Sequence, residues 1–230
     1  MLELGLDGVV IAPSILSADF GALDAAVDSI AADADWVHVD VMDGHFVPNL
    51  TIGPPVVAAL RRHSAAFLDC HLMMTNPGDY LEAFAAAGAD SCTIHIEVGN
   101  TAALVGQARR LGIGVGLAVN PETPFERVAP FVGAVDLLLI MTVHPGFGGQ
   151  SFMEEVVPKV ARARSAVEAA GSATLIEVDG GIDVVTAPVV ARAGARVFVA
   201  GSAVFGRPDP GQACRDLRAA AAQAVVAGRW

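Results

Sequence analysis

Histidine and aspartate residues stand near the ends of several short apolar runs, in a pattern that suits metal binding and acid/base chemistry. His38 and Asp40 are two residues apart in one run, so both side chains would face the same side of a strand. His71 lies in the next run, and Asp179 follows a later one. This mixture of imidazoles and carboxylates suits a catalytic divalent transition metal, with positions left open for substrate or water. The geometry does not choose among Zn, Fe, Mn and Co.

The alternative for these residues is a purely structural role. A lone histidine on an apolar strand is more often a hydrogen-bonded core residue than a metal ligand. Burying two carboxylates without a cation or hydrogen bonds, however, costs several kcal/mol, which favours a metal for this set. We expect His95, Glu97 and His144, whose partners are not evident in the sequence, to have ordinary structural roles.

Glycine-rich segments follow three of the later apolar runs. They are Pro145-Gly146-Phe147-Gly148-Gly149-Gln150, Asp179-Gly180-Gly181 and Gly201-Ser202. Glycine lets main-chain N–H groups approach an anion closely, and helix N-termini add favourable charge. Each segment alone could be a tight turn. Together they predict a phosphate site built from main-chain amides.

Composition limits the classes of ligand and partner. The 230 residues include 14 Lys and Arg against 25 Asp and Glu, a net charge of −11, and Lys159 is the only lysine. Broad capture of nucleic acid or anionic membrane is therefore not expected. A hydrophobic fraction of 53% excludes a disordered chain.

Targeting and cysteine usage predict a cytoplasmic protein. Residues 1–7 contain two acids and no basic residue, unlike the start of a secretory signal. No apolar run approaches the ~18 residues of a membrane span. The three cysteines, Cys70, Cys92 and Cys214, are an odd number at unrelated spacings and suit reduced core residues.

Apolar runs and helix-like segments alternate along the whole chain. The expected strands are Ile11–Leu16, Trp36–Met42, Phe67–Met73, Ser91–Ile96, Gly114–Val119, Leu137–Val143, Thr174–Val178 and Val197–Ala200. The expected helices are Phe20–Ala32, Pro54–Arg62, Pro77–Ala87, Thr101–Leu111, Phe125–Phe131, Phe152–Ala170, Val184–Ala193 and Gln212–Ala227. Eight such units predict an α/β fold, a single (β/α)₈ TIM barrel over residues 1–230.

An open dinucleotide-binding sheet is the competing architecture. Its glycine-rich turn should follow the first strand, where none is found. The Gly112-Ile113-Gly114-Val115-Gly116 string enters a strand instead, so we interpret it as a helix end and a strand start. In a barrel, the ends of the second and seventh strands place Asp40 and Asp179 on opposite walls of the mouth.

Several motifs, in a fixed order between residues 12 and 205, resemble those of the ribulose-phosphate 3-epimerase family. They are Ala12-Pro13-Ser14-Ile15-Leu16-Ser17-Ala18-Asp19, His38-Val39-Asp40-Val41-Met42-Asp43-Gly44-His45-Phe46-Val47-Pro48-Asn49, His71-Leu72-Met73, Pro145-Gly146-Phe147-Gly148-Gly149-Gln150, Asp179-Gly180-Gly181-Ile182 and Ala200-Gly201-Ser202. The resemblance implies a barrel of the ribulose-phosphate-binding type. It also implies an isomerase of the pentose-phosphate pathway that interconverts D-ribulose 5-phosphate and D-xylulose 5-phosphate.

The resemblance also implies roles for particular residues. The metal would be held by His38, Asp40, His71 and Asp179, one divalent cation per subunit, with no organic cofactor. The phosphorylated ketose would contact Ser14, Met42, His71, Met73, Met141, Gly146, Phe147, Gly148, Gly149, Asp179, Gly180, Gly181, Gly201 and Ser202. Members of this family often assemble as homo-oligomers.

Epimerisation beside a ketone requires a proton to leave one face of carbon three and another to reach the opposite face. Asp40 and Asp179 fit as an opposed catalytic acid/base pair, one ionised and the other protonated at the start. A metal between them would stabilise the 2,3-enediolate. Methionines over that intermediate would exclude water without offering an acid.

Three other functions remain as alternatives. An epimerase acting on a hexulose phosphate, such as allulose 6-phosphate, would have a similar site. Related barrel lyases carry Asp-x-Lys, but Asp40-Val41-Met42 has methionine in place of that lysine. A non-catalytic phosphosugar-binding barrel should lack one of the metal-ligating residues or one of the two aspartates.

His144 departs from the Asn or Glu that is common at its position in the family, which leaves the contacts of its loop open.

Overall fold

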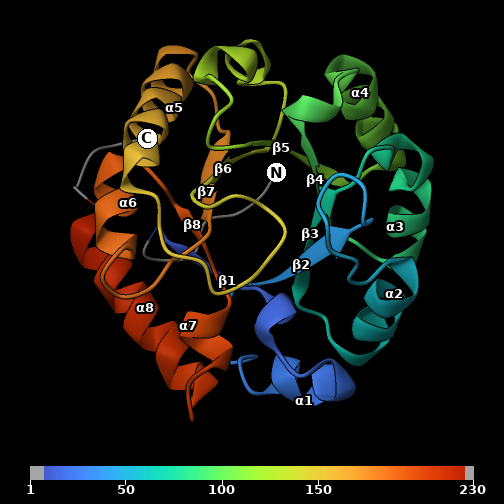
Figure 1. Ribbon diagram of the computed structural model, residues 1–230, viewed down its shortest axis with the longest axis vertical. Coiled ribbons are helices and arrows are strands. Elements are labelled where there is room, and N and C mark those ends of the chain that lie inside the picture. The colour runs from blue at the N-terminus through green and yellow to red at the C-terminus, as the bar shows by residue number, and fades with distance from the viewer. Residues whose placement is uncertain (1–7, 226–230) are drawn as a thin grey trace.

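The computed structural model describes residues 8–225, which form a (β/α)₈ barrel (Figure 1). Its parallel strands are neighbours in the order β1-β8-β7-β6-β5-β4-β3-β2. A parallel bridge between Ser14 and His38 joins the two ends of this sheet. The strands are β1 Val10–Pro13, β2 Trp36–Met42, β3 Phe67–Met73, β4 Ser91–His95, β5 Gly114–Val119, β6 Leu137–Met141, β7 Leu175–Asp179 and β8 Val197–Ala200.

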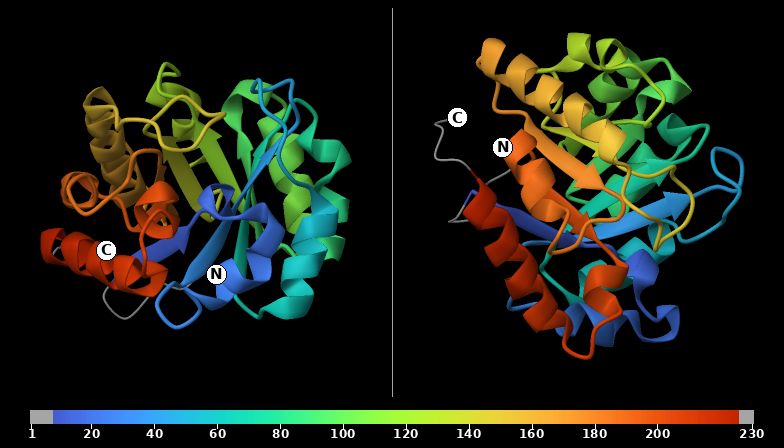
Figure 2. Two further views of the ribbon diagram at one scale, coloured as in Figure 1. Left: turned by 60° about the horizontal axis from the view of Figure 1, so that its bottom comes forward. Right: turned by 60° about the vertical axis from the view of Figure 1, so that its left-hand side comes forward.

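Helices surround the strands on the outside, and long loops leave the carboxyl ends of β2 and β6 at one end of the barrel (Figure 2). The α-helices are α1 Leu23–Asp28, α2 Pro54–His63, α3 Leu81–Ala87, α4 Thr101–Leu111, α5 Val157–Ala169, α6 Ala187–Ala193, α7 Ser202–Phe205 and α8 Pro210–Ala224. The 3₁₀ turns are η1 Ile15–Ser17, η2 Phe20–Ala22, η3 Pro77–Asp79, η4 Ile96–Val98, η5 Phe125–Arg127, η6 Ala129–Phe131 and η7 Glu154–Val156. Between residues 8 and 225, no helix has both the length and the apolar character to cross a membrane.

An apolar layer closes the amino-terminal end of the barrel interior. The residues of this basal layer are Val10, Ala12, Trp36, Leu137, Leu175, Val197 and Val199. Trp36 stacks on Phe67, with ring centroids 4.7 Å apart. Because side chains alternate along each strand, the next inward positions of β2, β3 and β7 bring His38, Asp69 and Glu177 above this layer. In the part of the chain that the structure describes, the polar inward positions therefore lie on the carboxyl side of this apolar layer.

Three strands end earlier than predicted, among them β4, which ends at His95 and not at Ile96. The first was expected to reach Leu16, but β1 stops at Pro13, and the Ser14 hydroxyl accepts a hydrogen bond from the Leu16 N–H in η1. The sixth was expected to reach Val143, but β6 stops at Met141. The Thr142 N–H donates to the carbonyl oxygen of residue 179 at 2.8 Å, and its hydroxyl lies 2.9 Å and 2.6 Å from the carbonyl oxygens of residues 179 and 180.

Proline accounts for the clearest error among the predicted helices. Phe125–Phe131 forms the turns η5 and η6 in place of an α-helix. Pro130 has no N–H to donate, so the helical hydrogen-bond ladder cannot continue through it. The short helix α7 was not predicted, and Phe152–Ala170 becomes helical only at η7 and α5. The predicted end of the last helix, residues 226–227, lies outside the described residues.

Glycines end two of the helices where the chain turns back into a strand. Gly88 and Gly112 adopt left-handed conformations at the ends of α3 and α4, with φ of 96° and 76°. Gly114 begins β5, and a Cβ on Gly116 would overlap the Thr93 side chain of the neighbouring strand. The Gly112–Gly116 string is thus the end of α4 and the start of β5, as predicted. Cys70, Cys92 and Cys214 are buried free thiols, also as predicted.

Candidate active site

Four side chains from β2, β3 and β7 meet at the carboxyl end of the barrel. One ligand atom from each of His38, Asp40, His71 and Asp179 lies within 4.8 Å of the others. Asp40 Oδ1 is 3.1 Å from His71 Nδ1 and 3.4 Å from His38 Nε2. Asp179 Oδ2 is 3.8 Å from His71 Nδ1. The convergence of these four side chains, which was predicted from strand order, is therefore confirmed.

The hydrogen bonds of His38 direct one free nitrogen into this cluster. Its Nδ1 lies 2.7 Å from Asp69 Oδ2, and Ser91 Oγ donates to the other Asp69 oxygen at 2.5 Å. Nδ1–H is therefore the donor to Asp69. The buried Nε2 has no hydrogen-bond partner among the described residues and faces Asp40. In the neutral form of His38, Nε2 carries a buried lone pair beside a carboxylate, an arrangement that a cation would satisfy.

The two carboxylates of the cluster have opposite electrostatic environments. Burial acts to raise the pKa of Asp40, but His38 and His71 outweigh it and hold that pKa well below its usual value. Burial, reinforced by the Asp40 charge, raises the pKa of Asp179 to about 7. Before a cation binds, the site therefore holds one ionised carboxylate and one that takes up a proton near neutrality.

The two imidazoles also differ. Burial lowers the pKa of His38, but Asp40 and Asp69 overcome this effect and raise it well above its usual value. For His71 burial dominates, and its pKa falls in spite of the contact with Asp40.

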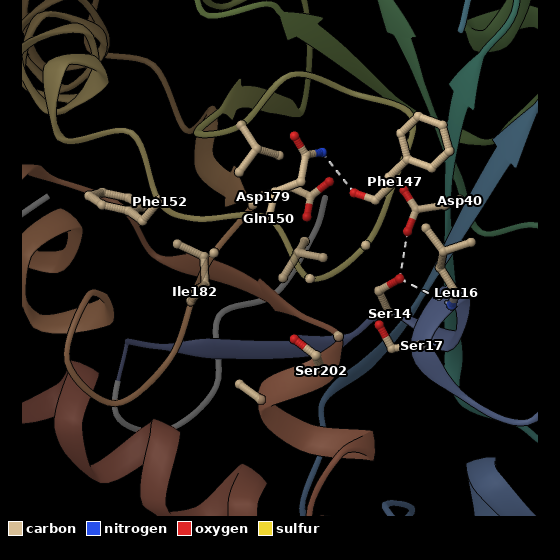
Figure 3. A pocket seen from close by; sticks show the side chains of 18 of the residues that line it. Ser14, Leu16, Ser17, Asp40, Phe147, Gln150, Phe152, Asp179, Ile182 and Ser202 are labelled. Carbon is tan, nitrogen blue, oxygen red and sulfur yellow. Dashed lines mark hydrogen bonds between the residues drawn. The ribbon is translucent and has the colours of Figure 1, made fainter. Parts of the chain in front are cut away.

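Ser14 lies directly beside Asp40 in the open part of the site. Its Oγ donates to Asp40 Oδ2 at 2.5 Å, and Figure 3 shows this bond together with the Asp179 side chain on the other side of the cavity. Thr51 Oγ1 donates to the Asp40 main-chain oxygen at 2.7 Å. Asp40 is thus held from both its side chain and its main chain.

A second buried group lies beneath the first and includes Asp69 and Glu177, neither of which was predicted to have a site role. Glu177 Oε1 is 3.6 Å from His38 Nδ1, and within residues 8–225 both buried Glu177 oxygens are without a hydrogen-bond partner. Burial and the Asp69 charge raise the pKa of Glu177 well above its usual value. The only sequence signal for Asp69 and Glu177 was their inward-facing position on the predicted strands. The alternation of side chains along a strand does not distinguish such residues from ordinary core residues.

His95 is fully buried and hydrogen-bonded through both ring nitrogens, as expected of a structural histidine, but one of its partners belongs to the cluster. Its Nε2 lies 2.8 Å from His71 Nε2, and its Nδ1 lies 3.1 Å from Glu97 Oε2. His95 and Glu97 therefore continue directly from the cluster. His144 lies outside the cluster, where its 61% exposed side chain pairs with Glu122 at 2.7 Å.

A cavity of about 480 Å³ opens above the cluster. Its lining includes every residue expected to contact substrate except His71, which is fully buried behind Asp40 and Asp179. The lining also contains Ser17, Asp183 and Arg207, which were not predicted. Arg207 is the only basic side chain among the lining residues.

The glycine loops leave main chain, not side chains, on one wall of the cavity. Gly180 and Gly181 have φ of 119° and 64°, a region that other residues rarely adopt. A Cβ on Gly181 would lie 2.5 Å from the Phe152 nitrogen, and one on Gly201 would overlap Ser17 Oγ. Close approach of the loops thus requires glycine at these positions.

Fold and site together define a (β/α)₈-barrel protein with a histidine–aspartate cluster at the carboxyl mouth and a glycine-lined cavity above it. Residues 10–205 match the model of the ribulose-phosphate 3 epimerase family. The chain belongs to this family.

Individual relatives are similar to this chain over most of its length. The cytoplasmic isoform of ribulose-phosphate 3-epimerase from Oryza sativa subsp. japonica is 50% identical over 214 residues, covering 90% of this chain and 92% of that protein. Ribulose-phosphate 3-epimerase from Rhodobacter capsulatus is 50% identical over 199 residues, covering 86% of each. The crystal structure of 3-hexulose-6-phosphate synthase from Salmonella typhimurium has a TM-score of 0.71 at 18% identity, covering 94% of this chain and 100% of that one. That likeness extends to the fold alone.

Proposed function

We propose that this chain is an isomerase that interconverts D-ribulose 5-phosphate and D-xylulose 5-phosphate by epimerisation at carbon three. The proposal is supported by relatives of that name at 50% identity over nearly the full chain. The observation that carries the chemistry is the pair of carboxylates, Asp40 on β2 and Asp179 on β7, in one buried cluster with opposite pKa shifts.

The two carboxylates would exchange protons with opposite faces of the substrate. The ionised carboxylate takes the proton from carbon three, and the electron pair of the broken C–H bond moves into the C2–C3 bond as the carbonyl oxygen becomes negative. The protonated carboxyl group then donates its proton to the other face of carbon three. In the reverse reaction the roles exchange, so the protons of Asp40 and Asp179 belong to a coupled pair.

One divalent cation would be held by His38, Asp40, His71 and Asp179. The unpaired His38 Nε2 and the mixed nitrogen and oxygen donor set fit a transition metal such as Zn, Fe, Mn or Co. Such a cation would supply a Lewis acid beside the oxygens that become negative. Asp69 would fix the ring of His38 so that Nε2 keeps its lone pair directed at the site.

Other lining residues would bind and shield the substrate. Met42, Met73 and Met141 lie in the cavity lining and offer no proton that could quench the enediolate. Ser14, already bound to Asp40, would contact the sugar. The phosphate would be bound by the main chain of three glycine segments, which are Gly146–Gly149, Gly180–Gly181 and Gly201–Ser202.

A coupled epimerase assay tests the function. Activity should be present with D-ribulose 5-phosphate, fall after chelator treatment, and return when a divalent metal is restored. An active protein shown by elemental analysis to contain no metal would remove the metal from the proposal. Higher kcat/KM with allulose 6-phosphate than with the pentulose phosphate would favour the hexulose alternative. We also expect a homo-oligomer, which sedimentation would detect.

A further inference from the structure

A chain of hydrogen bonds runs outward from the cluster through two buried imidazoles. His71 Nε2 is 2.8 Å from His95 Nε2, and His95 Nδ1 is 3.1 Å from Glu97 Oε2. Both imidazoles are fully buried, whereas the Glu97 side chain is 21% exposed. The nearly parallel rings lie 5.0 Å apart, 22° from coplanar.

The direction of these hydrogen bonds is determined at the outer end. The Glu97 carboxylate accepts the Asn120 N–H at 2.9 Å on Oε1, and its hydrogen bonds outweigh burial to lower its pKa to about 2. An ionised carboxylate only accepts hydrogen bonds, so His95 Nδ1 carries the proton. In a neutral imidazole the other nitrogen is then an acceptor. His95 Nε2 therefore accepts from His71 Nε2–H.

This direction decides which His71 nitrogen can bind a cation. With its proton on Nε2, His71 presents the lone pair of Nδ1 to Asp40 Oδ1 at 3.1 Å and to Asp179 Oδ2 at 3.8 Å. When both carboxyl groups are ionised, the site then has an imidazole lone pair beside carboxylate oxygens, all of which are acceptors. A cation between them satisfies every group at once.

We propose that His95 and Glu97 are positioning residues that fix the tautomer and ring orientation of His71, and through it the affinity of the cluster for its divalent cation. This inference rests on the metal site given under the proposed function. His95 holds His71 as Asp69 holds His38, so the two ligand imidazoles are oriented by independent partners.

Co²⁺ binding to metal-free protein, measured by competition with a chromophoric chelator, tests the proposal. His95→Leu removes the acceptor for His71 and should weaken Co²⁺ binding about 10- to 100-fold, the usual effect of losing such a partner. His95→Gln offers an amide oxygen in the same place and should recover most of that loss. Glu97→Gln, at the solvent end, should weaken binding less than His95→Leu.

His63→Leu is the matched control. His63 forms an imidazole–carboxylate pair with Asp28 at 3.0 Å, outside the cluster, so its loss should leave Co²⁺ affinity unchanged. Circular dichroism of each variant checks that the barrel has folded. If His95→Leu does not fold, Glu97→Gln carries the test, and wild-type Co²⁺ affinity in that variant would overturn the proposal.

NMR of histidine-labelled, metal-free protein gives a readout that requires no activity. Long-range ¹H–¹⁵N couplings should show the proton of His71 on Nε2 in the wild type. A proton on Nδ1 would overturn the inference, as would wild-type Co²⁺ affinity in a folded His95→Leu variant. Failure of the wild type to bind Co²⁺ would instead overturn the proposed metal site, and the inference with it, whatever the tautomer.

Discussion

At the scale of single residues, the site depends on carboxylates whose surroundings differ. Asp40 receives a hydrogen bond from Ser14 and contacts two imidazoles, whereas burial and the Asp40 charge dominate the environment of Asp179. Opposed acid/base chemistry requires such a difference between two groups of the same type. The carboxylate oxygens of Asp40 and Asp179 would also bind the cation. Metal binding and proton transfer would therefore depend on the same oxygens.

Asp40→Asn and Asp179→Asn should each abolish most epimerisation. The amide keeps the size of the side chain but cannot take up or donate the carboxyl proton, so kcat should fall about 10²- to 10⁴-fold. Exchange of the carbon-three proton with deuterated solvent, followed by NMR, measures the step directly. Undiminished exchange in either variant, with metal content equal to wild type, would reject the assignment of that residue.

At the scale of elements, the loops after β2 and β3 are joined by one carboxylate. Asp43 Oδ1 accepts the N–H groups of His45 and Phe46, each at 2.8 Å. Asp43 Oδ2 accepts the N–H and the hydroxyl of Thr75 at 2.8 Å and 3.0 Å. Burial acts to raise the pKa of Asp43, but these hydrogen bonds prevail and lower it to about 2. The carboxylate therefore stabilises the rim of the site in its ionised form.

Asp43→Asn should lower the free energy of unfolding by about 1 kcal/mol at pH 7, because the amide replaces an acceptor with a donor facing Thr75. The folded pKa of Asp43 of about 2 lies below the usual value of 3.8, so its contribution is present above pH 4 and is lost as pH falls toward 2. Urea denaturation from pH 7 to pH 2.5 should show the difference between wild type and variant narrowing below pH 4. A difference that stays constant over this range would contradict the prediction. Asp216→Asn, an exposed change on α8, should have an effect within about 0.5 kcal/mol.

The loops after β6 and β7 approach each other closely enough to require glycine. Gly181→Ala places a Cβ 2.5 Å from the Phe152 nitrogen in a conformation with φ of 64°, so the loops must separate. We expect a loss of more than about 2 kcal/mol in stability, together with a raised KM for ribulose 5-phosphate.

Gly171→Ala separates the effect of close packing from that of backbone strain. Gly171 has a φ of 56°, but a Cβ there would meet nothing within 4 Å. This variant should lose only about 1 kcal/mol and keep its KM. Thermal denaturation and steady-state kinetics on both variants measure the two effects, and equal losses would show that loop packing is not the cause.

At the scale of the whole molecule, the barrel separates stability from chemistry along its axis. The basal layer is apolar and closed, and the polar cluster and cavity lie at the opposite end. Desolvation of the ionisable groups is possible because the apolar core provides the stability that the polar end lacks.

Leu137→Ala should test this separation. Leu137 is fully buried in the basal layer, so its truncation should cost about 2–5 kcal/mol by loss of contacts and formation of a cavity. The KM of the folded enzyme should be unchanged, since Leu137 is not among the residues that line the substrate cavity. Val185→Ala, at a side chain that is 72% exposed, serves as the control and should alter stability by no more than about 0.5 kcal/mol. A large rise in KM for Leu137→Ala would contradict the prediction.

The sequence by itself determined the repeat of strands and helices, the shared face of His38 and Asp40, and the glycines at loops that meet closely. These follow from periodicity and backbone conformation within single elements. Only the tertiary structure decided how neighbouring strands meet. His71 is the register partner of Thr93, yet its Nε2 contacts His95 two residues further along β4. Periodicity specifies which way a side chain points within its own strand, but the tilt and stagger of the closed barrel determine which atoms from different strands come into contact. For this reason the partners of His95, Asp69 and Glu177 could not be predicted from sequence.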